Sequence, residues 1–160
     1  MSGEEATGTP PSNGGKLYWI TGDFWKIVAN GEDTENKYSI MDVTIMPKNG
    51  VKSHIHSRED EALYIIDGQF EVQYGDQKIN STNGVHLFLK RGISHSFKNV
   101  GNKEGRLLVM FTPAGCEKMY EELGIPVMDV KAFSRPYTFP NLIKAIQLLR
   151  KYGIEAKSLF

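Results

Sequence analysis

The chain has 160 residues, and its 19 Lys and Arg balance its 19 Asp and Glu. This length predicts one domain with tails, and the balanced charge offers no positive field for nucleic acid or an anionic membrane surface. Cys116 is the only cysteine, which excludes an intrachain disulfide and a zinc knuckle. Because there is no run of about 18 apolar residues and no signal-like start, we expect a cytoplasmic protein that does not cross a membrane.

Short runs rich in β-forming residues occupy the middle of the chain. Residues 1–16 are rich in Gly, Ser, Thr, Pro and Glu, which predicts a flexible tail. The predicted strands that follow are Leu17–Thr21, Phe24–Asn30, Tyr38–Met46, Ala62–Ile66, Phe70–Tyr74, Val85–Leu89 and Arg106–Thr112. Turn residues separate them, as at Asp67–Gly68 and at Tyr74–Asp76. Residues 17–114 therefore predict an all-β barrel or sandwich.

Helices are expected only in residues 115–160, a helical extension packed on the barrel. A short helix fits Gly115–Leu123, and a longer amphipathic one fits Asn141–Tyr152. The apolar stripe of the second helix consists of Leu142, Ile143, Ile146 and Leu149. Such a stripe packs on the barrel or on a second subunit. Together with the β-rich residues 17–30, which could extend a sheet edge, it predicts a homodimer.

Three of the four histidines fall into a pattern typical of metal sites. His54 and His56 are two residues apart, so an extended strand projects both from one face. Glu61 opens the next apolar strand, and a hairpin could bring it to the two imidazoles. Two imidazoles and a carboxylate suit one divalent ion of Fe, Mn, Ni, Co or Zn. His95 follows Gly92 at the start of another strand and can be a fourth ligand.

Two segments carry a resemblance to a known family. Residues 50–68, GVKSHIHSREDEALYIIDG, resemble the first cupin motif, and residues 84–99, GVHLFLKRGISHSFKN, resemble the second. The resemblance implies a double-stranded β-helix, a jelly-roll-like barrel, with its metal on His54, His56, Glu61 and His95. In this sequence Lys90 stands where the family usually has proline. Residues 111–124 and 151–155 are similar to small single-domain cupins of the quercetin-dioxygenase-like kind.

Several neighbouring residues have alternative interpretations. Glu59 and Asp60 compete with Glu61 as ligand, but they precede the strand and are expected to be solvated. His86 lies outside the pattern and is expected in the core or lining a pocket. Asn99 is expected to bond to backbone or to a group behind the ligands, and Cys116 to be structural.

Strand alternation places Leu63 and Ile65 on the face of Glu61, and Phe97 on the face of His95, which predicts an apolar substrate pocket. Phe88, Met41, Met110 and Trp25 are further candidates for its wall.

These features predict a metal-dependent oxidoreductase, dioxygenase-like, acting on a small apolar or aromatic enol. Glu61 would be both ligand and catalytic base, a role that requires a raised pKa. Two alternatives stay open: a cupin that binds a small molecule without turnover, and a metal-assisted isomerase or lyase.

Overall fold

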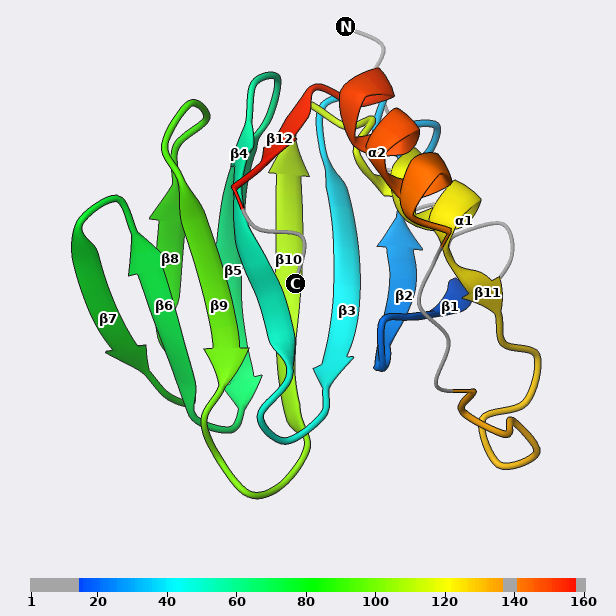
Figure 1. Cartoon of the computed structure of the whole chain (residues 1–160), viewed down its shortest axis with the longest axis horizontal. Helices are drawn as coiled ribbons and strands as arrows, with labels where there is room; N and C mark the ends of the chain where they lie inside the picture. Colours follow the sequence, from blue (N-terminus) through cyan, green and yellow to red (C-terminus); the bar gives the residue numbers. More distant parts are fainter. Residues whose placement is uncertain (1–14, 137–140, 158–160) are drawn as a thin grey trace, which may run out of the picture.

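Two antiparallel sheets face each other in the computed structural model, which describes residues 15–136 and 141–157 (Figure 1). The seven-stranded sheet has the order β11-β1-β2-β3-β10-β5-β8 and the five-stranded sheet the order β12-β4-β9-β6-β7. The strands of the first sheet are β1 (Lys16–Ile20), β2 (Asp23–Ala29), β3 (Ser39–Ile45), β5 (Asp60–Asp67), β8 (His86–Leu89), β10 (Gly105–Thr112) and β11 (Ile125–Pro126). Those of the second are β4 (Gly50–His56), β6 (Phe70–Tyr74), β7 (Gln77–Ser81), β9 (His95–Asn99) and β12 (Ile154–Ala156). The predicted all-β, jelly-roll-like fold with short helices is confirmed.

The core lies between the two sheets because alternate residues of each strand point inward. In β10, Leu107, Val109 and Phe111 are fully buried, whereas the residues between them are half-buried. Leu63 and Ile65 of β5 and Phe97 of β9 belong to the same core cluster. The burial of each such side chain contributes roughly 1.5–3 kcal/mol, so the predicted pocket residues also stabilise the barrel.

Most predicted strands lie within two residues of the observed ones, but some strands were not predicted from apolar runs. The sequence of β7, QKINS, is mostly polar because the strand forms an exposed edge of the second sheet. β4 and β9 were expected only from their histidines. The hairpin turns are placed correctly, with Gly68 at φ 112° and Gly75 at φ 55°, conformations that favour glycine.

Both predicted helices form. α1 (Glu117–Leu123) lies against the barrel, where Tyr120 stacks on Trp25 with ring centroids 4.6 Å apart. α2 (Leu142–Lys151) begins at Asn141, whose side chain accepts hydrogen bonds from the backbone N–H groups of residues 143 and 144. Figure 1 shows the two helices side by side at one flank of the barrel. In the described residues no helix is long and apolar enough to cross a membrane.

The apolar stripe of α2 is only partly covered. Leu149 packs on the core cluster, as does the buried Leu148 beside the stripe, but Leu142 is 44% exposed and Ile143 is 68% exposed. The first turn of α2 therefore exposes apolar side chains to solvent in the single chain.

The residues after 114 also supply strands, which the sequence did not suggest: β11 pairs with β1, and β12 pairs with β4. The predicted tail falls mostly outside the described residues, and Lys16 already belongs to β1.

Candidate metal centre

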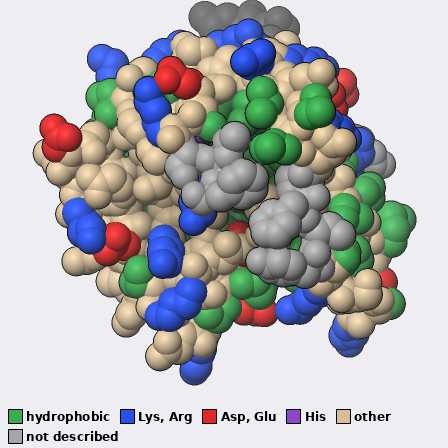
Figure 2. All heavy atoms as spheres, viewed as in Figure 1, with side chains coloured by type: hydrophobic (Ala, Val, Ile, Leu, Met, Phe, Trp, Pro, Cys, Tyr) green, Lys and Arg blue, Asp and Glu red, His purple; other side chains and the backbone are tan. Residues whose placement is uncertain are grey.

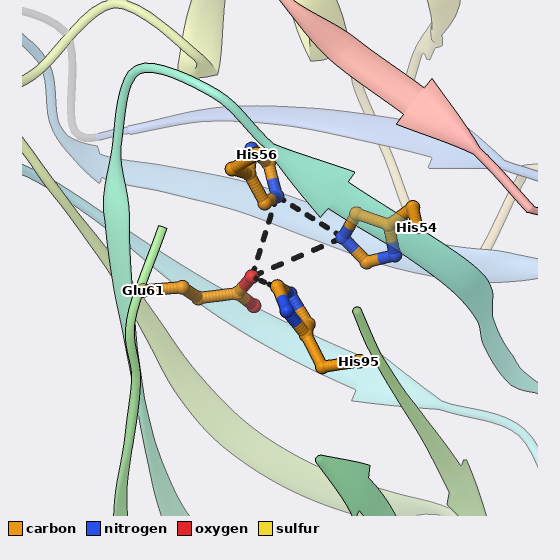
Figure 3. A group of neighbouring side chains, drawn as sticks. All are labelled: His54, His56, Glu61 and His95. Carbon is orange, nitrogen blue, oxygen red and sulfur yellow. Dashed lines mark hydrogen bonds and ion pairs between the residues drawn. The ribbon is translucent and has the colours of Figure 1, made fainter. Parts of the chain in front are cut away.

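Four predicted side chains converge between the two sheets (Figure 3). His54 Nε2 lies 3.0 Å from His56 Nε2, and Glu61 Oε2 lies 3.4 Å from His56 Nε2 and 4.0 Å from His54 Nε2. His95 Nε2 lies 2.8 Å from the same Glu61 oxygen. All four ligand atoms are within 4.8 Å of one another, and all four residues are buried.

Strand register places these groups. His54 and His56 share the inner face of β4, and β4 pairs with β9 so that His54 stands opposite His95. Glu61 comes from β5 in the other sheet and reaches across the core. The N–H of Gly92 donates to the carbonyl oxygen of His56 at 2.8 Å, which ties the turn before β9 to the end of β4. The site therefore links the two sheets.

Two of the imidazoles are oriented by backbone carbonyls. His54 Nδ1 lies 2.8 Å from the carbonyl oxygen of Lys52, and His95 Nδ1 lies 3.0 Å from that of Ile93. A carbonyl can only accept, so each Nδ1 carries a proton and each ring directs its Nε2 toward the centre. Burial lowers the pKa of His54 to about 4, which keeps this ring neutral at neutral pH.

His56 has different neighbours behind its ring. Its Nδ1 lies 3.4 Å from Glu59 Oε2 and 4.0 Å from Cys116 Sγ. Burial alone would lower the pKa of His56, but its polar contacts with Cys116, Glu59 and Glu61 outweigh burial and raise this pKa.

Burial likewise would raise the pKa of Glu61, but hydrogen bonds with His56 and His95 hold it below its usual range. The direction is opposite to that needed by a catalytic base, so the base role of Glu61 stays a prediction for the metal-bound protein.

The donor set fits a divalent transition metal. The Nε2 atoms of His54 and His56 lie 3.0 Å apart, and when both are unprotonated their lone pairs repel unless a positive centre lies between them. Three imidazole nitrogens and one carboxylate oxygen supply four donors of the type that Fe, Mn, Co, Ni and Zn accept. With two Nδ1 atoms fixed on carbonyls, the rings are already turned for coordination.

Comparison with known proteins identifies the scaffold. The sequence model described as the cupin domain matches residues 41–111, the segment that contains all four converging side chains. This match covers less than half of the chain and shows that the segment resembles a cupin domain. Among curated proteins, the tetracenomycin polyketide synthase protein TcmJ of Streptomyces glaucescens is 28% identical over 71 residues, which cover 44% of this chain and 48% of that protein. The chain thus spans about half the length of the curated relatives it matches.

Solved structures share the fold. KdgF from a Halomonas species has a TM-score of 0.57 at 19% identity, covering 64% of this chain and 91% of its own. A predicted oxalate decarboxylase from Thermotoga maritima has a TM-score of 0.54 at 22% identity, covering 61% and 90%. Identities this low show a shared barrel fold alone.

Lys90 stands where the cupin motif usually has proline, and its backbone N–H takes part in a hydrogen bond. The backbone N–H of Lys90 donates to the hydroxyl of Tyr74 at 3.3 Å, a bond that a proline could not make. The next residue, Arg91, binds Asp60 through its guanidinium and its backbone N–H. The turn before His95 is thereby attached to β6 and to the start of β5.

Three expectations about neighbouring residues were wrong. Glu59 is not solvated but 4% exposed, because the loop after β4 turns its side chain inward behind His56. His86 is exposed rather than in the core or a pocket, because it pairs with Tyr64 on the outer face of the sheet. Phe88, on the same face of β8 as His86, is 57% exposed and is not part of an inner wall.

The expectations for Asn99 and Cys116 agree with the structure. Asn99 bonds to backbone, donating to the carbonyls of Ile45 and Lys103 and accepting from Gly101 N–H. Cys116 is buried, and burial raises the pKa of its thiol to about 11 despite the neighbouring His56, so it stays protonated. Asp60 is engaged with Arg91 and lies outside the converging group.

Proposed function

We propose that His54, His56, Glu61 and His95 hold one divalent transition metal, and that this cupin is a dioxygenase-like oxidoreductase acting on a small apolar or aromatic enol. The observation that carries the proposal is the convergence of four donors within 4.8 Å, with two rings fixed on backbone carbonyls. Bound there, the metal supplies a Lewis acid that orients an enolate oxygen and lowers the cost of its negative charge.

We expect a substrate to reach the centre from the side of His54. His54 is 8% exposed, whereas His56, Glu61 and His95 are only 1–2% exposed. An incoming molecule therefore meets His54 first, and the other three donors lie deeper. Such burial excludes water from the carboxylate and strengthens its electrostatic contacts.

The surroundings of the centre are apolar, which supports an aromatic or enol substrate over a sugar. The ring of Phe111 lies 5.1 Å from that of His56, and Phe97, Leu63 and Ile65 are buried in the adjoining core. The name of TcmJ refers to a polyketide synthase. Polyketide chains contain β-diketone units, which enolise readily, so this relative supports the same substrate class.

On the exterior, Lys and Arg side chains on the face shown in Figure 2 are interspersed with Asp and Glu. This pattern supports a small molecule rather than a polyanion as the ligand.

The test is metal analysis of protein purified without chelator, followed by oxygen uptake with a panel of flavonols and β-diketones. We expect about one equivalent of metal and uptake with at least one β-diketone or flavonol. A matched control is His86→Ala, which removes the exposed histidine outside the centre. Metal and substrate binding without oxygen uptake would support the non-catalytic binder, and product formation without uptake the isomerase or lyase. A parent protein without metal would overturn the proposal.

A further inference from the structure

The three imidazoles of the centre are held from behind in two different ways. His54 and His95 donate from Nδ1 to backbone carbonyls, which are neutral. His56 alone has a carboxylate behind it, with Glu59 Oε2 3.4 Å from its Nδ1. A carboxylate accepts a hydrogen bond more strongly than a carbonyl and adds a negative charge to the ligand. The two kinds of support make the three rings unequal donors.

Neighbouring contacts hold the loop that carries Glu59. The hydroxyl of Ser57 donates to the carbonyl oxygen of Gly153 at 2.6 Å, and Arg58 Nη1 donates to that of Lys151 at 2.9 Å. On the other side of Glu59, Asp60 is bound by Arg91. Residues before and after Glu59 are thus fixed from outside, while Glu59 itself points inward and is 4% exposed.

Burying this carboxylate costs several kcal/mol unless a partner compensates. In residues 15–136 and 141–157, no Lys or Arg lies within ion-pair distance of Glu59, and its Oε2 makes no hydrogen bond of good geometry. The basic group within ion-pair distance of that oxygen is His56, whose Nδ1 lies 3.4 Å away. Among the described residues, Glu59 thus faces one basic partner, the ring whose Nε2 faces the centre.

We propose that Glu59 is the positioning residue of the metal centre: it accepts the Nδ1–H of His56, fixes Nε2 toward the ion and strengthens this one ligand. The inference rests on the proposed metal site. This arrangement also balances the charge of the buried site. The two carboxylates, Glu61 and Glu59, match the two positive charges of a divalent ion, and the rings of His54 and His95 are neutral ligands.

A competing arrangement uses the same residues. His56, Glu59 and Cys116 themselves form a group whose ligand atoms lie within 4.8 Å of one another, so they could hold a second ion. That ion would need Nδ1 of His56 as a donor, whereas a neutral ring whose Nε2 binds the first ion carries its proton on Nδ1. Positioning of His56 needs no such deprotonation, and it uses the proton that Nδ1 must carry when Nε2 binds a metal.

The experiment is a titration of metal-free protein with Co(II) alone, in competition with a chelator, for the parent, Glu59→Gln, Glu59→Ala and the control Glu71→Gln. Glu71 is a carboxylate on β6 paired with Lys78, outside the converging group. We expect one equivalent for the parent and a Kd about 10–100-fold higher for Glu59→Ala. Glu59→Gln keeps an acceptor oxygen and should recover part of that loss, and Glu71→Gln should match the parent.

Two further measurements separate positioning from folding. The near-ultraviolet circular dichroism of each variant should match the parent, and the Co(II) absorption bands should shift in both Glu59 variants. Parental Kd and parental bands in Glu59→Ala would overturn the inference while leaving the metal site standing. A second equivalent of Co(II) that disappears in Cys116→Ser would overturn it in favour of a second ion. No Co(II) binding by the parent would overturn the metal site as well.

Discussion

His54 and His95 stand opposite each other on β4 and β9, and each turns its Nδ1 to the backbone carbonyl two residues earlier in its own strand or turn. The same local contact thus holds the Nδ1 side of both rings. His56 differs because its support comes from Glu59 and Cys116. This difference makes His56 the most informative ligand to change.

His56→Ala should remove most bound metal and leave the barrel folded, because the core between the sheets is apolar and does not need this ring. Loss of a ligand should weaken metal binding by more than about 100-fold, since loss of a group behind a ligand already costs 10–100-fold. Metal content and circular dichroism of parent and variant check this. Equal metal content in both would remove His56 from the ligand set.

Glu61→Gln addresses the double role predicted for this carboxylate. The amide can coordinate weakly, so the three histidines should retain part of the metal, but it cannot accept a proton, so nearly all turnover should be lost. Turnover is compared at matched metal occupancy. A variant with parental turnover would exclude Glu61 as the base.

Asp23 should make stability depend on pH. Its carboxyl is 1% exposed and accepts the N–H of Met46, and burial, only partly opposed by hydrogen bonds, raises its pKa from 3.8 to about 7. A raised folded-state pKa means that stability is full below pH 3.8 and falls as the pH rises toward 7.

Asp23→Asn should abolish this dependence. Relative to the parent, the variant should be unchanged near pH 4 and become progressively more stable as the pH rises to about 7, by about 1.4 kcal/mol for each pH step of one. Denaturant unfolding of both proteins at each pH gives the difference directly. A constant difference across the range would refute the assignment.

Gly50 should be intolerant of any side chain. A Cβ there would lie 2.1 Å from the carbonyl oxygen of Phe97 and 2.7 Å from Lys98 Cα, both on β9. Gly50→Ala should therefore cost about 2–3 kcal/mol and weaken metal binding, because β4 and β9 carry all three histidines. Gly84→Ala is the control: its φ is 86° but nothing lies within 4 Å, so we expect about 1 kcal/mol of backbone strain and parental metal affinity.

The predicted homodimer stays a proposal that α2 makes testable. Ile143 is 68% exposed on the first turn of α2, where an apolar contact with a second chain would cover it. Light scattering should give the mass of two chains for the parent and a shift toward one chain for Ile143→Glu. Gln147→Glu, an exposed change on the same helix, should leave the mass unaltered. A monomeric parent at high concentration would contradict the proposal.

Local periodicity together with the resemblance to the two cupin motifs was sufficient to predict the four converging residues. His54 and His56 must share a face on any extended strand, and Glu61 with Leu63 and Ile65 follows the same rule. The burial of Glu59 was not predicted, because a charged residue inside the run Ser-Arg-Glu-Asp is normally solvated. Its burial depends on contacts of the loop with Lys151 and Gly153, more than ninety residues away. The available signal was its spacing of three residues from His56.

Strand register explains why the exposure of His86 was not predicted. Glu61, Leu63 and Ile65 point inward, so Tyr64 must point outward, and His86 lies beside Tyr64. Period-two spacing alone could not place His86 because nothing in the sequence states which residue of β5 it faces. Cys116 approaches His56 from α1 across 60 residues, again through tertiary packing.

The pairing of β12 with β4 also has a consequence for biosynthesis. Ile154 stands opposite His56 and Ala156 opposite His54, and Ser57 and Gly153 are joined across 96 residues. At about 5–20 residues per second, the ribosome completes β4 about 5–20 seconds before β12 exists. Both edges of β4 are open until β9 is made, and one edge stays open from then until β12 exists, so it can pair with another chain. A nascent chain halted before residue 150 would carry all four donors, yet the strand that flanks two of them would still be missing.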